Sequence, residues 1–190
     1  MKVLKHKLLR INHWLMSVGA IVVFLGSWTP GAIAAERVIL KYRIFQNSVA
    51  VSDLTTLAET GEVSDELKPY FRLSRQEPEK VREILNQTVD VDVVTLDRVL
   101  NSFAGDFILE RLNQYIYTES READTQAMRA ALVLSASKDN KVSLLEVTQN
   151  YPTQDVYIDG DRLEEAYDQL TLLRGSVENL LERLPNFLGG

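Results

Sequence analysis

The amino-acid sequence predicts a mainly α-helical fold: a compact multi-helix domain with two short β-strands, preceded by a secretory signal peptide. Three observations support this prediction. The 190 residues are 45% hydrophobic and 25% charged, which is typical of one globular domain. Apolar residues recur at spacings of three and four through most of the chain, as they do in amphipathic helices. Residues 38–45 and 156–158 instead have the β-branched and aromatic composition of strands.

Residues 1–34 have the three parts of a secretory signal peptide. Four basic residues and no acidic ones lie between Lys2 and Arg10, and an apolar run follows at 15–25. Ala32 and Ala34 supply the small residues that signal peptidase recognises. The apolar run is shorter than the roughly 20 residues of a membrane-spanning helix. We therefore expect cleavage after Ala34 and no stable membrane anchor in the mature chain.

The mature chain is predicted to be acidic and exported. Cleavage after Ala34 leaves 156 of the 190 residues, and the loss of four basic residues changes the formal net charge from −6 to −10. An acidic chain repels phosphate groups, so we expect neither nucleic acid nor an anionic membrane surface as a partner. A signal of this kind is compatible with the periplasm, the thylakoid lumen or the extracellular space.

The mature chain also lacks histidine, cysteine and tryptophan. Both histidines, His6 and His13, and both tryptophans lie in the predicted signal peptide, and the chain has no cysteine. A Ser-His-Asp triad needs an imidazole base, and histidine or thiolate metal sites need ligands that are missing here. We expect no cofactor and no metal site. This composition argues against an enzyme, because catalysis is left with carboxylates, Lys, Tyr, Ser or Thr.

The mature chain is predicted to begin with the strand 38–45 and to continue with short helices. Ser52 is predicted to cap the first helix, which ends at Gly61. A second helix is predicted over 64–67, limited by Pro69 because proline lacks a backbone N–H.

Longer helices are predicted in the middle of the chain. One begins at Pro78, and another is capped by Asp92 after a short extended piece at 89–91. Residues 103–117 have an amphipathic pattern, whereas the helix that begins at Asp124 is apolar nearly all round. That helix is therefore expected in the core.

The domain 35–160 is predicted to end with a short helix and a strand. Ser143 and Glu146 have the spacing of a capping box, which marks the start of the helix. The strand 156–158 follows, and we expect it to pair with the strand near residue 40.

Residues 161–190 are predicted to form a C-terminal amphipathic helix. Its apolar pattern spans about three heptads, the lower limit for a coiled coil. The candidate interaction face consists of Leu163, Tyr167, Leu170, Leu173, Val177, Leu180 and Leu184. Two interpretations stay open: this face packs on its own domain, or it binds a partner.

The segment 135–146 matches two functional patterns weakly. Ser135 and Lys138 have the S-x-x-K spacing of serine–lysine acyl-transfer enzymes, but the companion motifs S-D-N and K-T-G are missing. The segment also has the length of a calcium-binding EF-hand loop, yet Asn140 replaces the turn glycine and two lysines lie in the loop. A lysine at a helix C-terminus and a polar turn are the simpler interpretations. The tyrosines near residues 115 and 157 could line a groove or form the edge of the core.

The sequence resembles a known family. The segments that carry the resemblance are 35–45, 48–54, 58–64, 96–102, 129–136 and 143–152. They are similar to the cyanobacterial "alpha/beta hydrolase of unknown function" domain, over roughly residues 35–170. In many members this domain precedes a lipase-like α/β-hydrolase domain. The resemblance implies export and an accessory role, and it carries over no catalytic residue because no G-x-S-x-G motif is present.

Three functions are therefore considered. The first is a non-catalytic accessory or protein-interaction module, whose protein partner could be an exported hydrolase. The second is a module that binds a lipid or another apolar ligand between short helices. The third is a hydrolase, as the family description says, that acts through carboxylates or through Ser135 and Lys138.

Overall fold

The computed structural model describes residues 34–162 together with residues 165 and 168. The predicted signal peptide therefore lies outside the described residues, apart from Ala34. The candidate face formed by Leu163, Tyr167, Leu170, Leu173, Val177, Leu180 and Leu184 also lies outside them. Within the described ranges, no helix is both long enough and apolar enough to cross a membrane.

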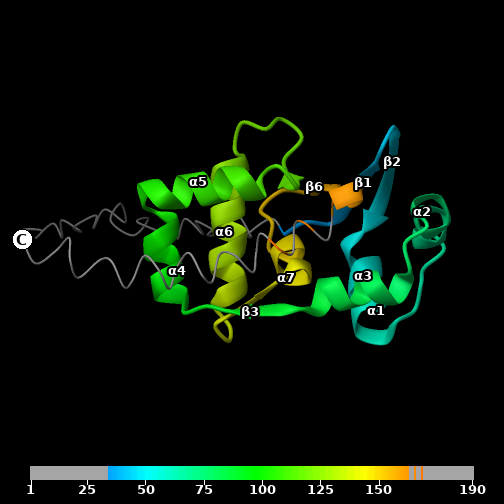
Figure 1. Cartoon of the computed structure of the whole chain (residues 1–190), viewed down its shortest axis with the longest axis horizontal. Coiled ribbons are helices and arrows are strands. Elements are labelled where there is room, and N and C mark those ends of the chain that lie inside the picture. Colours follow the sequence, from blue (N-terminus) through cyan, green and yellow to red (C-terminus); the bar gives the residue numbers. More distant parts are fainter. Residues whose placement is uncertain (1–33, 163–164, 166–167, 169–190) are drawn as a thin grey trace, which may run out of the picture. The chain divides into compact units, whose positions relative to one another are not determined.

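A four-stranded sheet organises the described body. Its strands are β1 (Arg37–Tyr42), β2 (Phe45–Ala50), β4 (Ile116–Tyr117) and β6 (Asp155–Asp159), in the order β2-β1-β6-β4. Strands β1 and β6 are parallel, and the other neighbours are antiparallel. The two predicted strands therefore do pair with each other, across more than 100 residues of chain (Figure 1).

The prediction of only two strands was wrong, because the chain also forms β2, β4 and a second sheet. That sheet pairs β3 (Thr88–Asp90) with β5 (Lys141–Ser143). The predicted strand 38–45 is in fact the hairpin of β1 and β2, which turns at Arg43 and Ile44. These additional strands are two to six residues long, so their sequences carry little periodicity and their pairing partners define them.

Seven α-helices and one 3₁₀ helix lie in the described ranges. They are α1 (Val51–Thr60), α2 (Leu67–Ser74), α3 (Pro78–Asn86), α4 (Val93–Leu100), α5 (Phe103–Leu112), α6 (Asp124–Ala136), α7 (Leu144–Gln149) and η1 (Gly160–Arg162).

Several predicted helix boundaries are confirmed by their capping bonds. The Asp92 carboxylate accepts a hydrogen bond from the Thr95 N–H at 2.8 Å, and Ser143 and Glu146 form the complete capping box. Gly61 ends α1 with a φ of 80°, a left-handed conformation in which a side chain is unfavourable.

Three predicted boundaries are corrected. Helix α1 begins at Val51 directly after β2, so Ser52 is not its cap. Helix α2 begins at Leu67, where the predicted helix ended, and Pro69 lies in its first turn, which tolerates proline. The helix predicted over 103–117 ends at Leu112, because the chain then enters strand β4.

The helices form one core with one face of the four-stranded sheet, and α4 and α5 join it by packing on α6. Strand residues on this face, such as Val38 and Val156, belong to the main core. Helix α6 contributes Met128 and Leu132, both fully buried, which confirms its predicted place in the core. This one core therefore holds the sheet and the helices of the described body together.

The opposite face of the sheet carries a small separate cluster. The rings of Tyr117 and Tyr157 stack with centroids 5.7 Å apart, next to Ile39. The Lys41 Nζ lies 5.2 and 5.0 Å from the two ring centroids, and the Arg121 guanidinium lies 3.2 Å from that of Tyr117. These tyrosines are therefore buried beneath cationic side chains and do not line an open groove.

Candidate functional site

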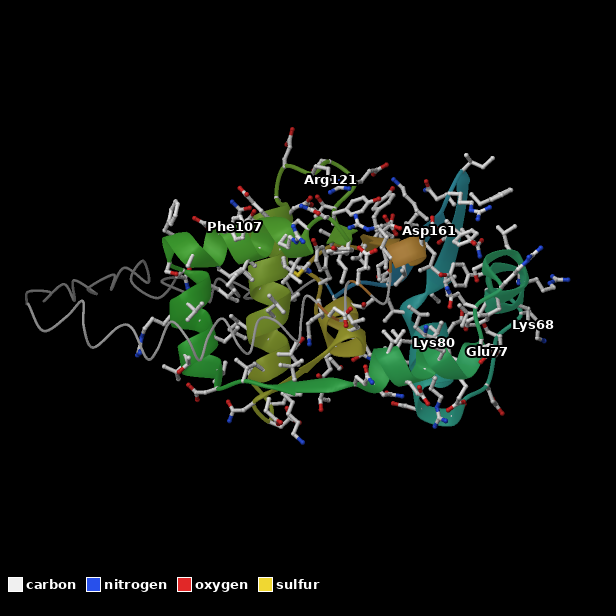
Figure 2. The ribbon with its side chains drawn as sticks, viewed as in Figure 1. Lys68, Glu77, Lys80, Phe107, Arg121 and Asp161 are labelled. Atoms are coloured by element: carbon white, nitrogen blue, oxygen red, sulfur yellow. The ribbon has the colours of Figure 1, made fainter. Side chains whose placement is uncertain are left out.

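The β1–β2 hairpin is held in place at its tip. Its two-residue turn contains Arg43, whose φ of 52° is rare for a residue with a side chain. The backbone N–H of Arg43 donates a hydrogen bond to the Asp161 carboxylate at 2.7 Å. Figure 2 shows Asp161 on η1, next to the strands. The bond to η1 stabilises the turn and fixes the direction in which the hairpin leaves the body.

Helix α2 lies beside the outer strand of this hairpin (Figure 1). The Asn47 side-chain amide donates to the Glu66 carbonyl at 3.2 Å, just before α2 begins. At the other end of α2, the Tyr42 hydroxyl donates to the Ser74 carbonyl at 3.4 Å. Both ends of α2 are therefore tied to the hairpin, but the space between them is not filled.

An apolar groove of about 140 Å³ lies between β2 and α2, here called the β2–α2 groove. It is lined by residues of the hairpin and of α2, namely Leu40, Tyr42, Phe45, Gln46, Asn47, Pro69, Tyr70 and Leu73.

The rim of the β2–α2 groove exposes large apolar side chains. Of the lining residues, Phe45 is 50% exposed and Leu73 42%; the adjacent turn residue Ile44 is 92% exposed. Apolar side chains clustered at the mouth of an apolar groove mark a surface that binds something, since soluble domains rarely expose such patches. This groove is therefore the candidate site.

Tyr70 forms the inner end of the β2–α2 groove. Its ring also borders two smaller cavities of about 20 and 50 Å³, one inside the core and one next to Lys80 and Asp161. The Tyr70 hydroxyl donates to the Gly160 carbonyl at 3.2 Å. Burial, and to a lesser degree the Asp161 carboxylate, raise the pKa of Tyr70 to about 12, so the hydroxyl stays neutral at physiological pH.

Gly160 is required next to Tyr70 because there is no room for a side chain. A Cβ at this position would lie 2.6 Å from the Tyr70 hydroxyl oxygen and 3.1 Å from the Lys41 carbonyl oxygen. The close approach brings η1, β1 and α2 together. It thereby fixes the inner end of the groove.

Basic side chains surround the outer side of the β2–α2 groove. Lys68, Arg72 and Arg75 follow each other along the solvent face of α2, and Arg43 lies at the hairpin tip. Lys68 is paired with Asp65 at 2.6 Å. In the described part of the chain, no ion pair reaches the guanidinium groups of Arg72 or Arg75. Three arginines, Arg43, Arg72 and Arg75, therefore face two nearby carboxylates, Glu66 and Asp161, at this rim, a modest local excess of positive charge on a chain of net negative charge.

The serine of the S-x-x-K pattern is a structural residue. Ser135 is fully buried in α6, and its hydroxyl donates to the Ala131 carbonyl at 2.8 Å. The same oxygen accepts a hydrogen bond from the Asn150 side-chain amide at 3.1 Å. Lys138 lies beyond the end of α6 and is exposed, and it is not one of the hydrogen-bond partners of this serine. A fully buried hydroxyl that is already hydrogen-bonded to two groups of the domain does not reach a substrate.

The residues of the calcium-loop pattern also have structural roles. Lys141–Ser143 form strand β5, and the Glu146 carboxylate accepts hydrogen bonds from both the N–H and the hydroxyl of Ser143. Across the described ranges, no group of three or more carboxylate or other metal-binding side chains is close enough to hold a metal ion.

Sequence patterns did not reveal the β2–α2 groove. Leu40 was predicted only as a strand residue, Pro69 as a helix stop, and Leu73 was not predicted at all. The sequence did contain one usable signal: Leu73 follows Pro69 by four residues, so both lie on one side of a helix that starts at Leu67. The missing information was the start of that helix.

A comparison with protein families assigns the described body to one of them. A family model described as "Alpha/beta hydrolase of unknown function (DUF1400)" matches residues 34–159. The chain belongs to this family. The match begins at the first described residue and ends with strand β6, so it covers the helices, both sheets and the β2–α2 groove. Neither the curated proteins nor the solved structures gave a match to the chain.

Proposed function

We propose that this chain is an exported, non-catalytic accessory module that binds a protein partner at the β2–α2 groove. The observation that carries the proposal is the apolar groove, in which the lining residues Phe45 and Leu73 are exposed. The family description makes a hydrolase the first candidate for the partner. The compartment is proposed to be the periplasm, the thylakoid lumen or the extracellular space.

The chemistry of the residues supports a non-catalytic role. Residues 34–190 contain no histidine and no cysteine, and Ser135 of the S-x-x-K pattern is enclosed in the core. An α/β-hydrolase needs a nucleophile on an exposed turn and an imidazole base. The hydrolase activity is therefore proposed to belong to the partner.

The size of the β2–α2 groove favours a protein over a lipid. Small-molecule sites usually have about 300–1,000 Å³ and enclose most of the ligand. A groove of about 140 Å³ takes one large apolar side chain, and its exposed rim can pack around that anchor. Protein interfaces concentrate their energy in such anchors.

The proposal is tested by affinity purification of the tagged full chain from its native cells, followed by mass spectrometry. We expect a stoichiometric exported protein, with a hydrolase first among the candidates. Leu73→Asp should abolish its recovery, because a carboxylate then enters the groove. Val94→Asp is the matched control: Val94 is 61% exposed on α4, outside the groove lining, and its variant should retain the partner.

The outcomes separate the proposed interfaces. If Leu73→Asp retains the partner whereas Leu173→Asp loses it, the interface is the predicted C-terminal face and not the β2–α2 groove. If the purified chain brings no protein but carries stoichiometric lipid, the accessory role is wrong and the apolar-ligand function replaces it.

A further inference from the structure

We propose that the partner contributes an extended acidic segment that adds as a strand to the free edge of β2 and places an apolar side chain in the β2–α2 groove. This inference rests on the proposed function, since it names the chemistry of the partner at the same site. It follows from the backbone of β2, the position of the groove and the charges around it.

The hydrogen-bond pattern shows which backbone groups of β2 face outward. The Val51 N–H donates to the Glu36 carbonyl at 2.9 Å, which makes this pair a hydrogen-bonded pair of the antiparallel ladder. Such pairs alternate, so Phe45, Asn47 and Val49 direct their N–H and C=O groups toward β1. Gln46 and Ser48 must direct theirs away from β1, toward the edge of the sheet.

Among the residues that the structure describes, no neighbour satisfies these outward groups. Strand β2 ends the sheet order β2-β1-β6-β4, and both Gln46 and Ser48 are exposed. No hydrogen bond to their backbone groups is found in residues 34–162 outside the β1–β2 ladder. An edge with free N–H and C=O groups is a template for another strand.

The β2 edge also lacks the usual features that prevent pairing. Its sequence, Phe-Gln-Asn-Ser-Val-Ala, contains no proline and no charged residue, and its register with β1 runs without a bulge. Natural edge strands that must stay single usually carry lysine, proline or a bulge. Strand β2 is therefore suited to accept a strand.

The β2–α2 groove gives the added strand a place for a side chain. Phe45 and Asn47 point to the same face of the sheet as Leu40, and this is the face that α2 covers. Alternate side chains of a strand added beside β2 would point to that face too, next to Pro69 and Leu73. Recognition by strand addition combines backbone bonds for affinity with such pockets for specificity.

The charges around the groove indicate an acidic segment. Arg43 lies at the hairpin tip, and Arg72 and Arg75 lie along α2. These three arginines outnumber the two nearby carboxylates, Glu66 and Asp161, of which Asp161 accepts the Arg43 N–H and keeps its charge. Lys68, at the outer side of α2 in Figure 2, adds little to this excess because it is paired with Asp65. Carboxylates of an extended segment would be attracted to this rim, whereas a basic segment would be repelled.

The test uses a phage-displayed library of random linear 12-residue peptides, selected against the full chain. We expect enriched peptides that are acidic and alternate apolar and polar residues. Their synthetic versions should slow amide hydrogen exchange at Gln46 and Ser48. This exchange measurement uses the unmodified chain, so it does not depend on any variant.

Ser48→Pro and Ser48→Thr form the matched pair of variants. The Ser48 N–H faces outward, so proline removes a donor of the edge without breaking the β1–β2 ladder. We expect the peptide Kd to rise at least tenfold with Ser48→Pro and to stay within twofold with Ser48→Thr. Arg72→Glu combined with Arg75→Glu should weaken acidic peptides by a similar factor.

Four results overturn the inference: no enrichment of any sequence, enrichment of basic peptides, exchange protection elsewhere than β2, or an unchanged Kd for Ser48→Pro. The native complex distinguishes this failure from failure of the proposed function. If the co-purified partner is lost with Leu73→Asp but retained with Ser48→Pro, the accessory role stands and strand addition is wrong.

Discussion

Tyr70 shows how a single side chain can join the core to the candidate site. It borders the β2–α2 groove, and its hydroxyl is the donor to the Gly160 carbonyl that holds η1 against α2. The Tyr70 side chain is buried as a neutral phenol, and ionisation of the hydroxyl would place a charge in this buried position. The pH dependence of stability therefore gives a direct measure of this residue.

We predict that Tyr70 makes the domain less stable at high pH. Its pKa is about 12 in the folded chain and about 10 when unfolded, so its contribution is complete below pH 10 and is lost between pH 10 and 12. Two pKa units correspond to up to about 3 kcal/mol. Urea unfolding of the wild type and of Tyr70→Phe, from pH 8 to 12, measures the difference.

The stability difference between the two proteins should be constant below pH 10 and should shift against the wild type above it. Tyr151, whose pKa is also raised by burial, titrates in both proteins and cancels in the comparison. A difference that stays constant up to pH 12 would show that the Tyr70 hydroxyl is not held in a buried environment.

Ser135 shows at the same scale why a motif is weaker evidence than a position. Its spacing to Lys138 was read correctly from the sequence. The spacing does not show the environment of this serine. Its hydroxyl bonds Ala131 one turn earlier in α6 and Asn150, which follows α7 and is 15 residues further along the chain. Burial and hydrogen-bond partners decide that this serine supports the core.

At the scale of elements, the capping box of α7 makes a separate prediction. The Ser143 hydroxyl accepts a hydrogen bond from the Glu146 N–H at 3.2 Å, while Glu146 binds the Ser143 N–H. Ser143→Ala should destabilise the domain by about 1–2 kcal/mol, because a buried helix start loses its partners. Urea unfolding at neutral pH measures this change.

Ser137→Ala is the control for this prediction. Ser137 also makes a side-chain hydrogen bond, to the Leu134 carbonyl at 2.6 Å, but it is exposed at the end of α6. Its replacement should cost well under 1 kcal/mol, since water replaces the lost partner. Equal losses in the two variants would contradict the special role of the box.

Some helix boundaries are set by capping residues close in the chain, whereas some strands form only because a segment far along the chain pairs with them. Asp92, Ser143 and Gly61 act within three or four residues of the chain, so their helix boundaries could be predicted. Strands β2, β4 and β5 exist because a distant strand lies beside them, and no periodicity in their own few residues reports this. Helix α2 was misplaced because Pro69 is compatible with both a helix stop and a first turn.

At the scale of the whole molecule, the candidate site could not be predicted because it joins two segments. The groove needs Leu40 and Phe45 from the hairpin and Leu73 from α2. Each of these is an unremarkable apolar residue in its own segment. Their meeting depends on the bonds of Asn47 to Glu66 and of Tyr42 to Ser74, which link parts of the chain about 20 to 30 residues apart.

The position of the first strand leads to a prediction about processing. The Glu36 N–H already bonds the Gln154 carbonyl at 3.0 Å, and Ala35 is buried, so the two residues after Ala34 already belong to the folded body. Cleavage there leaves every described strand of the sheet intact. We therefore expect the chain in native cells to start at Ala35, as measured by intact mass and N-terminal sequencing of the exported fraction.

Variants at the cleavage site test this prediction without disturbing the fold. Signal peptidase requires small residues at the first and third positions before the cut, so Ala34→Lys should leave the uncleaved 190-residue chain. Ile33→Val changes the position between them and should be processed normally. A wild-type chain that keeps its first 34 residues would show that this segment is an anchor, and the partner would then have to act at a membrane surface.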